Sequence, residues 1–286
     1  MQVGSLALGL AAAVGWGVAD FLVARVGDRL GTVATFAYAQ LSGALVLAGA
    51  VAVVGAPTDL PPDLWLALGG LGVVGAAAYL LLYGSLQVGP VAVASPIAAT
   101  NGAVAAVLGV VVLREPLGDA GAVGLALVTL GVVGSSVDVA DLRRAVRGEA
   151  TVLPGAALAV AASLALGSVM FALELFGDAV SLLALVLAIR AVGGLASLPL
   201  VVRSEAAVSP RLLAQLVAIG VVDAAAFVCF VLGLRAGRVA VVGPASSLFA
   251  VVTVVLAWLF LKESLTATQR VGIGLVLLGV PLLAGV

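Results

Sequence analysis

Runs of about 20 apolar residues follow one another along almost the whole chain, and each has the length that a transmembrane helix needs. Clusters of charged residues or proline separate the runs. The pattern predicts ten membrane spans joined by short loops. We place these spans at 4–25, 33–55, 64–86, 91–113, 118–137, 152–174, 180–202, 211–233, 239–261 and 266–285. The N-terminal run predicts a first membrane helix rather than a removed signal peptide, because it has neither a basic segment nor a small-residue cleavage site.

The composition narrows the classes of function. Of the 286 residues, 64% are hydrophobic and only 9% are charged, so polar side chains are too few to cover a globule in water. A net charge of -1 supplies no basic field for nucleic acid. The absence of His excludes His-based zinc sites and Ser–His dyads, and the lone Cys229 excludes an intramolecular disulfide. We therefore expect no enzyme, no cofactor, no bound metal and no nucleic-acid partner.

The chain contains an internal repeat. Residues 86–134 align without gaps on residues 234–282, at an offset of 148, with 19 identities in 49 positions. The earlier part aligns more weakly at an offset near 150, which places Gln40 on Arg190. Each half holds five spans, and this odd number makes the second half enter the membrane from the opposite side. Such a chain can exchange the roles of its halves and open a central cavity to each side in turn, as carriers do.

The sequence thus predicts an all-α integral membrane protein with ten transmembrane helices as two inverted five-helix repeats. The repeats are expected at 1–137 and 152–286, joined by a polar linker at 138–151.

Several motifs resemble those of a known family. Trp16-Gly17 lies in the first span. Each half then has a span with an early small-Pro step, a closing turn of the form charged-Glu-x-Leu, and a Gly-rich span. The two turns are Arg114-Glu115-Pro116-Leu117 and Lys262-Glu263-Ser264-Leu265. Over essentially its whole length the chain resembles the EamA-type family of the drug/metabolite transporter superfamily. The resemblance implies ten helices, two five-helix repeats and export or exchange of small metabolites.

Three charged residues fall well inside predicted spans, where charged groups usually face a cavity or a partner. Asp223 could couple transport to protons, hold a cationic substrate, or form a structural pair with Arg190. Arg190 could instead bind a substrate carboxylate or phosphate through two hydrogen bonds. Asp20 stands about where family members often carry Asn or Ser. It could reach into a cavity or lean toward the membrane interface.

Two further groups of residues are candidates for contact with the substrate. Pro96 and Pro244 occupy equivalent places in the two halves, and each frees a backbone carbonyl that could bind substrate or simply kinks a helix. The polar residues that follow them could line a cavity or hydrogen-bond neighbouring helices. These residues are Thr100, Asn101, Ser246 and Ser247. Aromatic side chains could stack on a substrate or serve packing. They are Trp16, Tyr79 and Phe227.

Other features have structural interpretations. The charged turns at 114–115 and 262–263 are predicted to fix helix termini. Glycines spaced by seven, at 124/131 and at 272/279, predict close helix contacts. Glu174, near the end of its span, predicts a solvated helix terminus.

We expect a secondary transporter that exports a small organic metabolite, such as an amino acid or a related compound, across the cytoplasmic membrane. A proton gradient, substrate exchange or downhill flux would drive it. Efflux of cationic drugs, with Asp20 or Asp223 as the partner of the cation, and flipping of a lipid headgroup remain alternatives. The expected partners are the small-molecule substrate and the lipid bilayer, with the protein as a monomer or a homodimer.

Orientation is predicted differently by two arguments. Ten spans put both termini on one side of the membrane. Loops on that side carry three Lys or Arg residues, and the opposite loops carry nine. Counting positive charges places the termini outside. The family resemblance implies that both lie in the cytoplasm.

Overall fold

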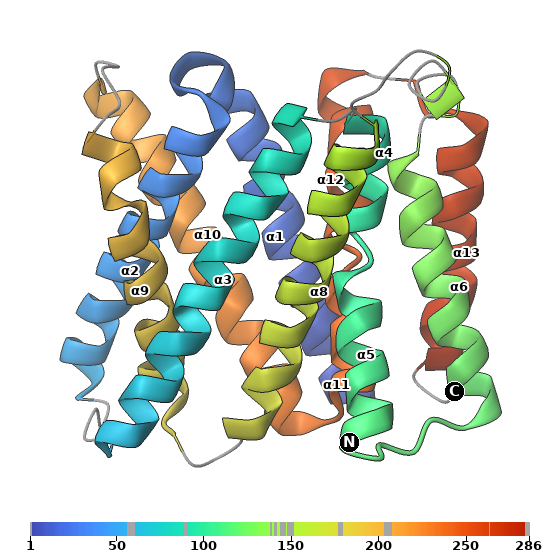
Figure 1. Ribbon diagram of the computed structural model, residues 1–286, viewed down its shortest axis with the longest axis horizontal. Coiled ribbons are helices and arrows are strands. Elements are labelled where there is room, and N and C mark those ends of the chain that lie inside the picture. The colour runs from blue at the N-terminus through green and yellow to red at the C-terminus, as the bar shows by residue number, and fades with distance from the viewer. Residues whose placement is uncertain are drawn as a thin grey trace.

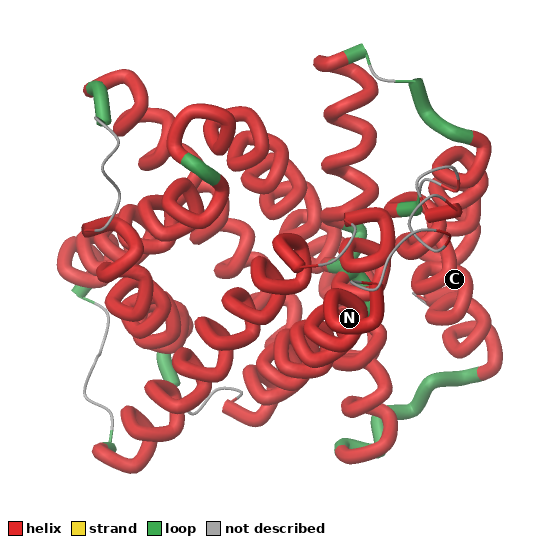
Figure 2. The backbone as a smooth tube through the Cα atoms, turned by 45° about the horizontal axis from the view of Figure 1, so that its top comes forward, coloured by secondary structure: helices red, strands yellow, loops and turns green. Residues whose placement is uncertain are grey.

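The computed structural model describes residues 2–55, 61–88, 91–137, 139, 142–143, 147, 152–176, 180–202, 208–262 and 264–283. Twelve helices account for the regular structure in these ranges, and Figures 1 and 2 draw no strand there. Their bounds are α1 Gln2–Leu30, α2 Thr32–Val54, α3 Pro62–Val88, α4 Val91–Ala98, α5 Asn101–Val112, α6 Asp119–Ser136, α8 Val152–Phe176, α9 Leu182–Val202, α10 Pro210–Ala236, α11 Val239–Ser246, α12 Phe249–Leu261 and α13 Ala267–Leu283. Most of the predicted linker at 138–151 lies outside the described residues.

The helices confirm the predicted all-helical fold of ten spans. Eight described segments are long and apolar enough to cross a membrane, and two shorter apolar helices, 182–196 and 267–283, bring the number to ten. The fourth span, 93–112, combines α4 with α5, and the ninth, 239–261, combines α11 with α12. Consecutive spans alternate in direction, and the second half runs opposite to the first (Figure 1).

The two ends of the bundle can be told apart by the chain. Helix α1 begins and α13 ends at one end, which we call the tail end (Figure 1). Helix α6 ends and α8 begins at the other, which we call the linker end. Local sequence features mark the points where the chain reverses direction between helices. Gly31, with φ +83°, separates α1 from α2, and Ser209 caps α10 by accepting a hydrogen bond from the Leu212 N–H, with Pro210 as the first helical residue.

The fourth and ninth spans are each broken a few residues after their proline. Pro96 lies inside α4 and Pro244 inside α11. At both junctions the backbone tightens, since the Thr100 N–H donates to Ile97 O at 3.1 Å and the Leu248 N–H donates to Ala245 O at 3.3 Å. Such breaks survive in a bilayer only where protein covers the backbone. Buried residues surround these two breaks, and the symmetry extends to their individual hydrogen bonds.

The last helices of the two halves, α6 and α13, pack with their backbones in direct contact. A Cβ added to Gly131 would lie 2.7 Å from Gly272 O, and one added to Gly279 would lie 2.9 Å from Gly124 O. Only glycine allows two helices to approach so closely. The close contacts predicted for the glycines spaced by seven are therefore present, and they join the two repeats at one edge of the bundle (Figure 1).

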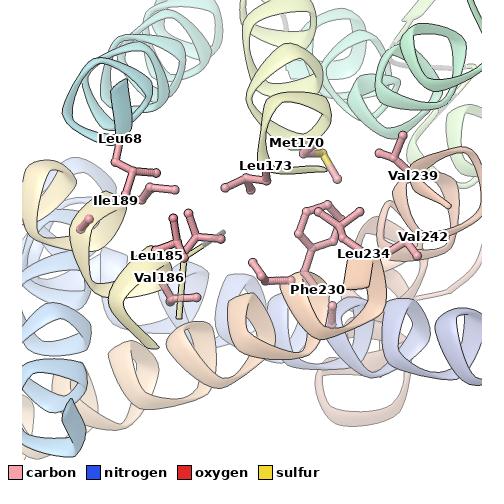
Figure 3. Close-up of a cluster of buried hydrophobic side chains, with 14 of the residues drawn as sticks. Leu68, Met170, Leu173, Leu185, Val186, Ile189, Phe230, Leu234, Val239 and Val242 are labelled. Atoms are coloured by element: carbon pink, nitrogen blue, oxygen red, sulfur yellow. The ribbon is translucent and has the colours of Figure 1, made fainter. Parts of the chain in front are cut away.

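A buried apolar cluster fills the tail end of the bundle between the two halves. Figure 3 shows side chains from α3, α8, α9, α10 and α11 converging there. We call this group the tail-end cluster. Its members include Leu68, Met170, Leu173, Leu185, Val186, Phe230, Leu234, Val239 and Val242. Leu68 comes from the second turn of α3, and the other side chains belong to the last turns of α8 and α10 and the first turns of α9 and α11, so they close that end of the bundle.

Replacing Gly131 by Ala tests the glycine contact. The new methyl group would strike both Gly272 O and Val276, so we expect a loss of about 1–3 kcal/mol of stability. The measurement is the thermal unfolding midpoint in detergent by tryptophan fluorescence. Gly70→Ala is the matched control, since Gly70 is exposed with no atom within 4 Å of the added Cβ. Equal midpoints for the two variants would contradict the close contact.

Candidate functional site

Arg190 on α9 is the centre of a polar network in the middle of the bundle. One terminal nitrogen donates to Asp223 Oδ2 on α10, and the other donates to Gln40 Oε1 on α2. The guanidinium carbon lies 6.0 Å from the ring centre of Phe227. The Arg190 side chain is 6% exposed and that of Asp223 is 16% exposed. The ion pair foreseen for Arg190 and Asp223 is therefore formed, and its carboxylate is the more accessible partner.

The contact between Gln40 and Arg190 marks the symmetry axis of the fold. These two residues are equivalent in the repeat, and a residue meets its own equivalent only close to a two-fold axis. Glycines one turn further along α2 and α9 leave the space that the side chains of Gln40 and Arg190 occupy. A Cβ on Gly43 would lie 3.2 Å from an Arg190 terminal nitrogen, and one on Gly193 would lie 3.1 Å from Gln40 Nε2. The halves thus differ chemically at the position where they meet.

The side chain of Asp20 on α1 is exposed. Its charge acts on Asp223 of α10 and on Tyr79 of α3, so its carboxylate faces the interior of the bundle rather than lipid. Arg190 and Asp223 also act on Tyr79. These four residues, with Gln40, make up what we call the central polar cluster. With Arg190 paired to Asp223, Asp20 leaves this cluster with one net negative charge. Within the described residues, no three potential metal ligands gather.

The aromatic candidates lie on the boundary between the central polar cluster and the tail-end cluster. Trp16 contacts Phe227 with ring centres 6.2 Å apart and Phe230 at 5.5 Å. Phe227 carries the cation–π contact to Arg190, whereas Phe230 is fully buried. Trp16 and Phe227 are therefore placed to form the apolar floor of a site whose polar groups lie on its linker side. Their stacking on a substrate stays a prediction.

The polar residues near the helix breaks form a second group, separate from the central polar cluster. Thr100 shares a hydrogen bond of 2.9 Å with Ser163 on α8, and Ser247 donates to Asn101 Oδ1 at 3.1 Å. Ser246 donates to Gly243 O in its own helix. These contacts join the broken spans to each other and to α8. Pro96 and Pro244 are buried at the same places, and a binding role for this group stays a prediction.

The first charged turn fixes a helix terminus, as its pattern indicates. The Glu115 carboxylate accepts hydrogen bonds from the Val239 N–H at 3.1 Å and the Ala240 N–H at 2.8 Å, which caps α11. Arg114 and Lys262 hold the same left-handed conformation, with φ of 55° and 57°. Glu263 lies outside the described residues. The turn of the first half therefore holds the start of the ninth span in the second half.

Glu174 differs from its prediction as a solvated terminus. Its side chain is half-buried near the end of α8, and Oε2 is buried without a hydrogen-bond partner among the described residues.

Sequence reasoning did not select two residues that complete these networks. Gln40 enters the sequence analysis only through its alignment on Arg190, and Ser163, the partner of Thr100, has no sequence signal of its own. The alignment of Gln40 on Arg190 was the signal that could have found the first. Residues equivalent in an inverted repeat and near mid-span are candidates for contact across the axis.

Comparison with known proteins defines the class. The sequence matches the EamA-like transporter family over residues 4–137 and again over 153–285. The chain therefore belongs to this family and is a multi-pass membrane transporter. No curated protein matches. A solved crystal structure described only as that of a protein is similar in fold, with a TM-score of 0.79 and 18% sequence identity. The similarity covers 99% of this chain and 97% of the other.

Removing one partner of the central ion pair should destabilise the protein more than removing both. Asp223→Ala leaves the Arg190 cation buried, and we expect a loss of about 2–3 kcal/mol, reduced from the value for a fully buried pair because the carboxylate is partly exposed. Adding Arg190→Met should restore most of the loss. The measurement is the thermal midpoint in detergent. A double variant no more stable than Asp223→Ala would contradict the pairing.

Proposed function

We propose that the protein is a secondary transporter that exports a small organic metabolite, such as an amino acid or a related compound, by alternating access. The observation that carries this proposal is an exposed carboxylate next to a buried ion pair in mid-membrane, beside the apolar tail-end cluster. A carrier needs such a site between two gates, of which one is closed. Because membership of the family gives transport but no substrate, the substrate class is argued from the charges of the cluster.

The charges suit a compound that carries an amino group. Asp20 is exposed and has no cation paired with it among the described residues, so it supplies the anion that an ammonium group requires. Trp16, Phe227 and Tyr79 add aromatic surface nearby, which favours cations and apolar groups alike.

Arg190 supplies a place for a carboxylate once its own partner is neutral. In the described state Asp223 and Gln40 occupy both of its terminal nitrogens. Protonation of Asp223 removes the charge that holds the pair, and a substrate carboxylate can then take the freed nitrogen. Proton binding and substrate binding are coupled in this scheme because both act through one guanidinium.

Efflux of an organic cation is the second candidate. The net negative charge of the central polar cluster favours it, because a cation without a carboxylate satisfies Asp20 and leaves the Arg190–Asp223 pair intact. The two candidates differ in whether Arg190 contacts the substrate.

We place the protein in the cytoplasmic membrane with both termini in the cytoplasm, following the family. The distribution of positive charge argues for the reverse, since Arg25 and Arg29 lie at the linker end. A reporter fused to the C-terminus, active only in the cytoplasm, decides between the two orientations. An inactive reporter would reverse the direction assigned to transport.

Vesicle uptake tests the function and the roles of the two residues. The protein is reconstituted, a proton gradient is imposed, and pooled amino acids and amines are screened for accumulation. Asp223→Asn should still exchange substrate across the membrane but lose gradient-driven accumulation. Arg190→Gln should weaken binding of a carboxylate-bearing substrate by about tenfold or more, since a charge-assisted hydrogen bond contributes about 1.5–3 kcal/mol.

The controls are the same substitutions at exposed positions near helix starts. Asp63→Asn on α3 and Arg211→Gln on α10 should behave as the parent. Accumulation by Asp223→Asn at the parental rate would end its coupling role. Unchanged carboxylate binding by Arg190→Gln would favour the organic-cation candidate.

A further inference from the structure

The structure fixes how the first helices of the two repeats correspond. At an offset of 150, Gly17 of α1 aligns with Gly167 of α8. A Cβ on Gly17 would strike the Val252 side chain and Phe249 O. A Cβ on Gly167 would strike equivalent atoms, the Val104 side chain and Asn101 O. Positions 104 and 101 correspond to 252 and 249 at the offset of 148, so both helices pack in the same register.

In this register Asp20 corresponds to Met170, and the two residues have opposite surroundings. Met170 is 9% exposed and belongs to the tail-end cluster, together with Phe230 and Val242 (Figure 3). Asp20 lies the same number of residues past its glycine on α1, toward the linker end, and is exposed. A single structural position is therefore apolar and buried in one half but acidic and exposed in the other.

Helix packing shows the same asymmetry. Helix α8 packs against α10 and α11, and α11 packs against α5. The equivalent pairs would be α1 with α3, α1 with α4, and α4 with α12. None of these pairs is in comparable contact within the described parts of the helices. The helix contacts that close the tail end therefore have no comparable counterpart at the linker end, where apolar groups of α1, α2 and α10 pack together instead.

Closing the linker end in the same way would change the surroundings of Asp20. Phe230 and Val242 correspond at the offset of 148 to Leu82 of α3 and Ala94 of α4. In the exchanged arrangement Asp20 takes the place of Met170 and these two residues face it. A charged carboxylate is strongly disfavoured among apolar groups, whereas a protonated or ion-paired one is tolerated.

Among the described residues no cation is paired with Asp20, and Arg25, five residues further along α1, lies over the Phe21 ring. Asp223 on α10 repels it, and Tyr79 on α3 is neutral in its usual form. Arg190 on α9 is engaged with Asp223 and Gln40. Helices α11 and α12 contain no titratable residue, and Tyr38 of α2 packs in an apolar group with Leu212 and Ile219. The neutralising charge must therefore come from a proton or from the substrate.

We propose that Asp20 controls closure of the linker end. The end closes only when a proton or a cationic group of the substrate neutralises the Asp20 carboxylate. The inference rests on the alternating access proposed above. It makes Asp20 a coupling residue, since an empty, charged site cannot pass to the other state. Met170 at the equivalent position imposes no such condition on the tail end.

The test measures the width of the linker end without substrate. Spin labels are placed at Arg29→Cys on α1 and Val88→Cys on α3, both exposed at that end, in a Cys229→Ser background. In the parent, lowering the pH from about 8 to about 5 should shift the labels to a shorter distance. Closure takes up a proton, so the closed-to-open ratio rises by up to about tenfold per pH unit. Asp20→Met and Asp20→Asn should show the short distance at both pH values.

The reciprocal exchange, Met170→Asp, is the matched variant. With labels at Leu175→Cys on α8 and Ala236→Cys on α10, it should open the tail end at about pH 8 and close it again at about pH 5. The parent should keep the tail-end distance short at about pH 8.

A parental linker-end distance that ignores pH overturns the proposal. So does an Asp20→Met variant that follows pH as the parent does or stays open throughout. Because the distances are measured without substrate, they test the closing condition independently of transport. Vesicle uptake that fails while the distances behave as expected would overturn the proposed function and leave the closing condition standing.

Discussion

The lipid bilayer gives a backbone N–H or carbonyl no partner, and the whole fold follows from this constraint. Every described span is helical, and the chain departs from the helix in mid-membrane only at the breaks of the fourth and ninth spans. There, the backbone bonds tighten, and the hydroxyls of Thr100, Ser246 and Ser247 donate additional hydrogen bonds to the Ile97 and Gly243 carbonyls. Buried neighbouring helices then exclude lipid from the break. The same constraint explains why Arg190, the cation that is buried among the described residues, has polar partners on two other helices.

Function arises where the two halves are unlike. Their helices share lengths, breaks and glycine contacts, so the repeat supplies a symmetric frame. The chemistry comes from pairs of equivalent positions that differ, namely Gln40 with Arg190, Met170 with Asp20, and Gly75 with Asp223. Each difference puts charge on one side of the axis only. Under the alternating access proposed above, such differences give the two states of a symmetric frame unequal affinities and closing conditions.

The fold was largely predictable from the sequence because its signals are local. Apolar run length fixed the spans within a few residues, and the repeat offset fixed their relative direction. The pair Arg190–Asp223 could be foreseen, because charged groups inside a bilayer are costly unless they pair with a group of opposite charge. The contact of Arg190 with Gln40, the exposure of Asp20 and the bond from Thr100 to Ser163 could not. These depend on which faces of separate helices meet, and composition without strong amphipathic patterning does not encode that.

The backbone contact between α6 and α13 also bears on how such a gene can evolve. Gly124 and Gly131 of one half fit against Gly279 and Gly272 of the other, so a larger residue in either stripe has nowhere to go. After the duplication that the repeat records, the two copies were free to diverge at the axis, where Gln faces Arg. Along this contact the surface of each copy is complementary to that of the other. A substitution in one stripe is tolerated only when the other stripe changes with it. We therefore expect these positions to keep the residues of the common ancestor longest.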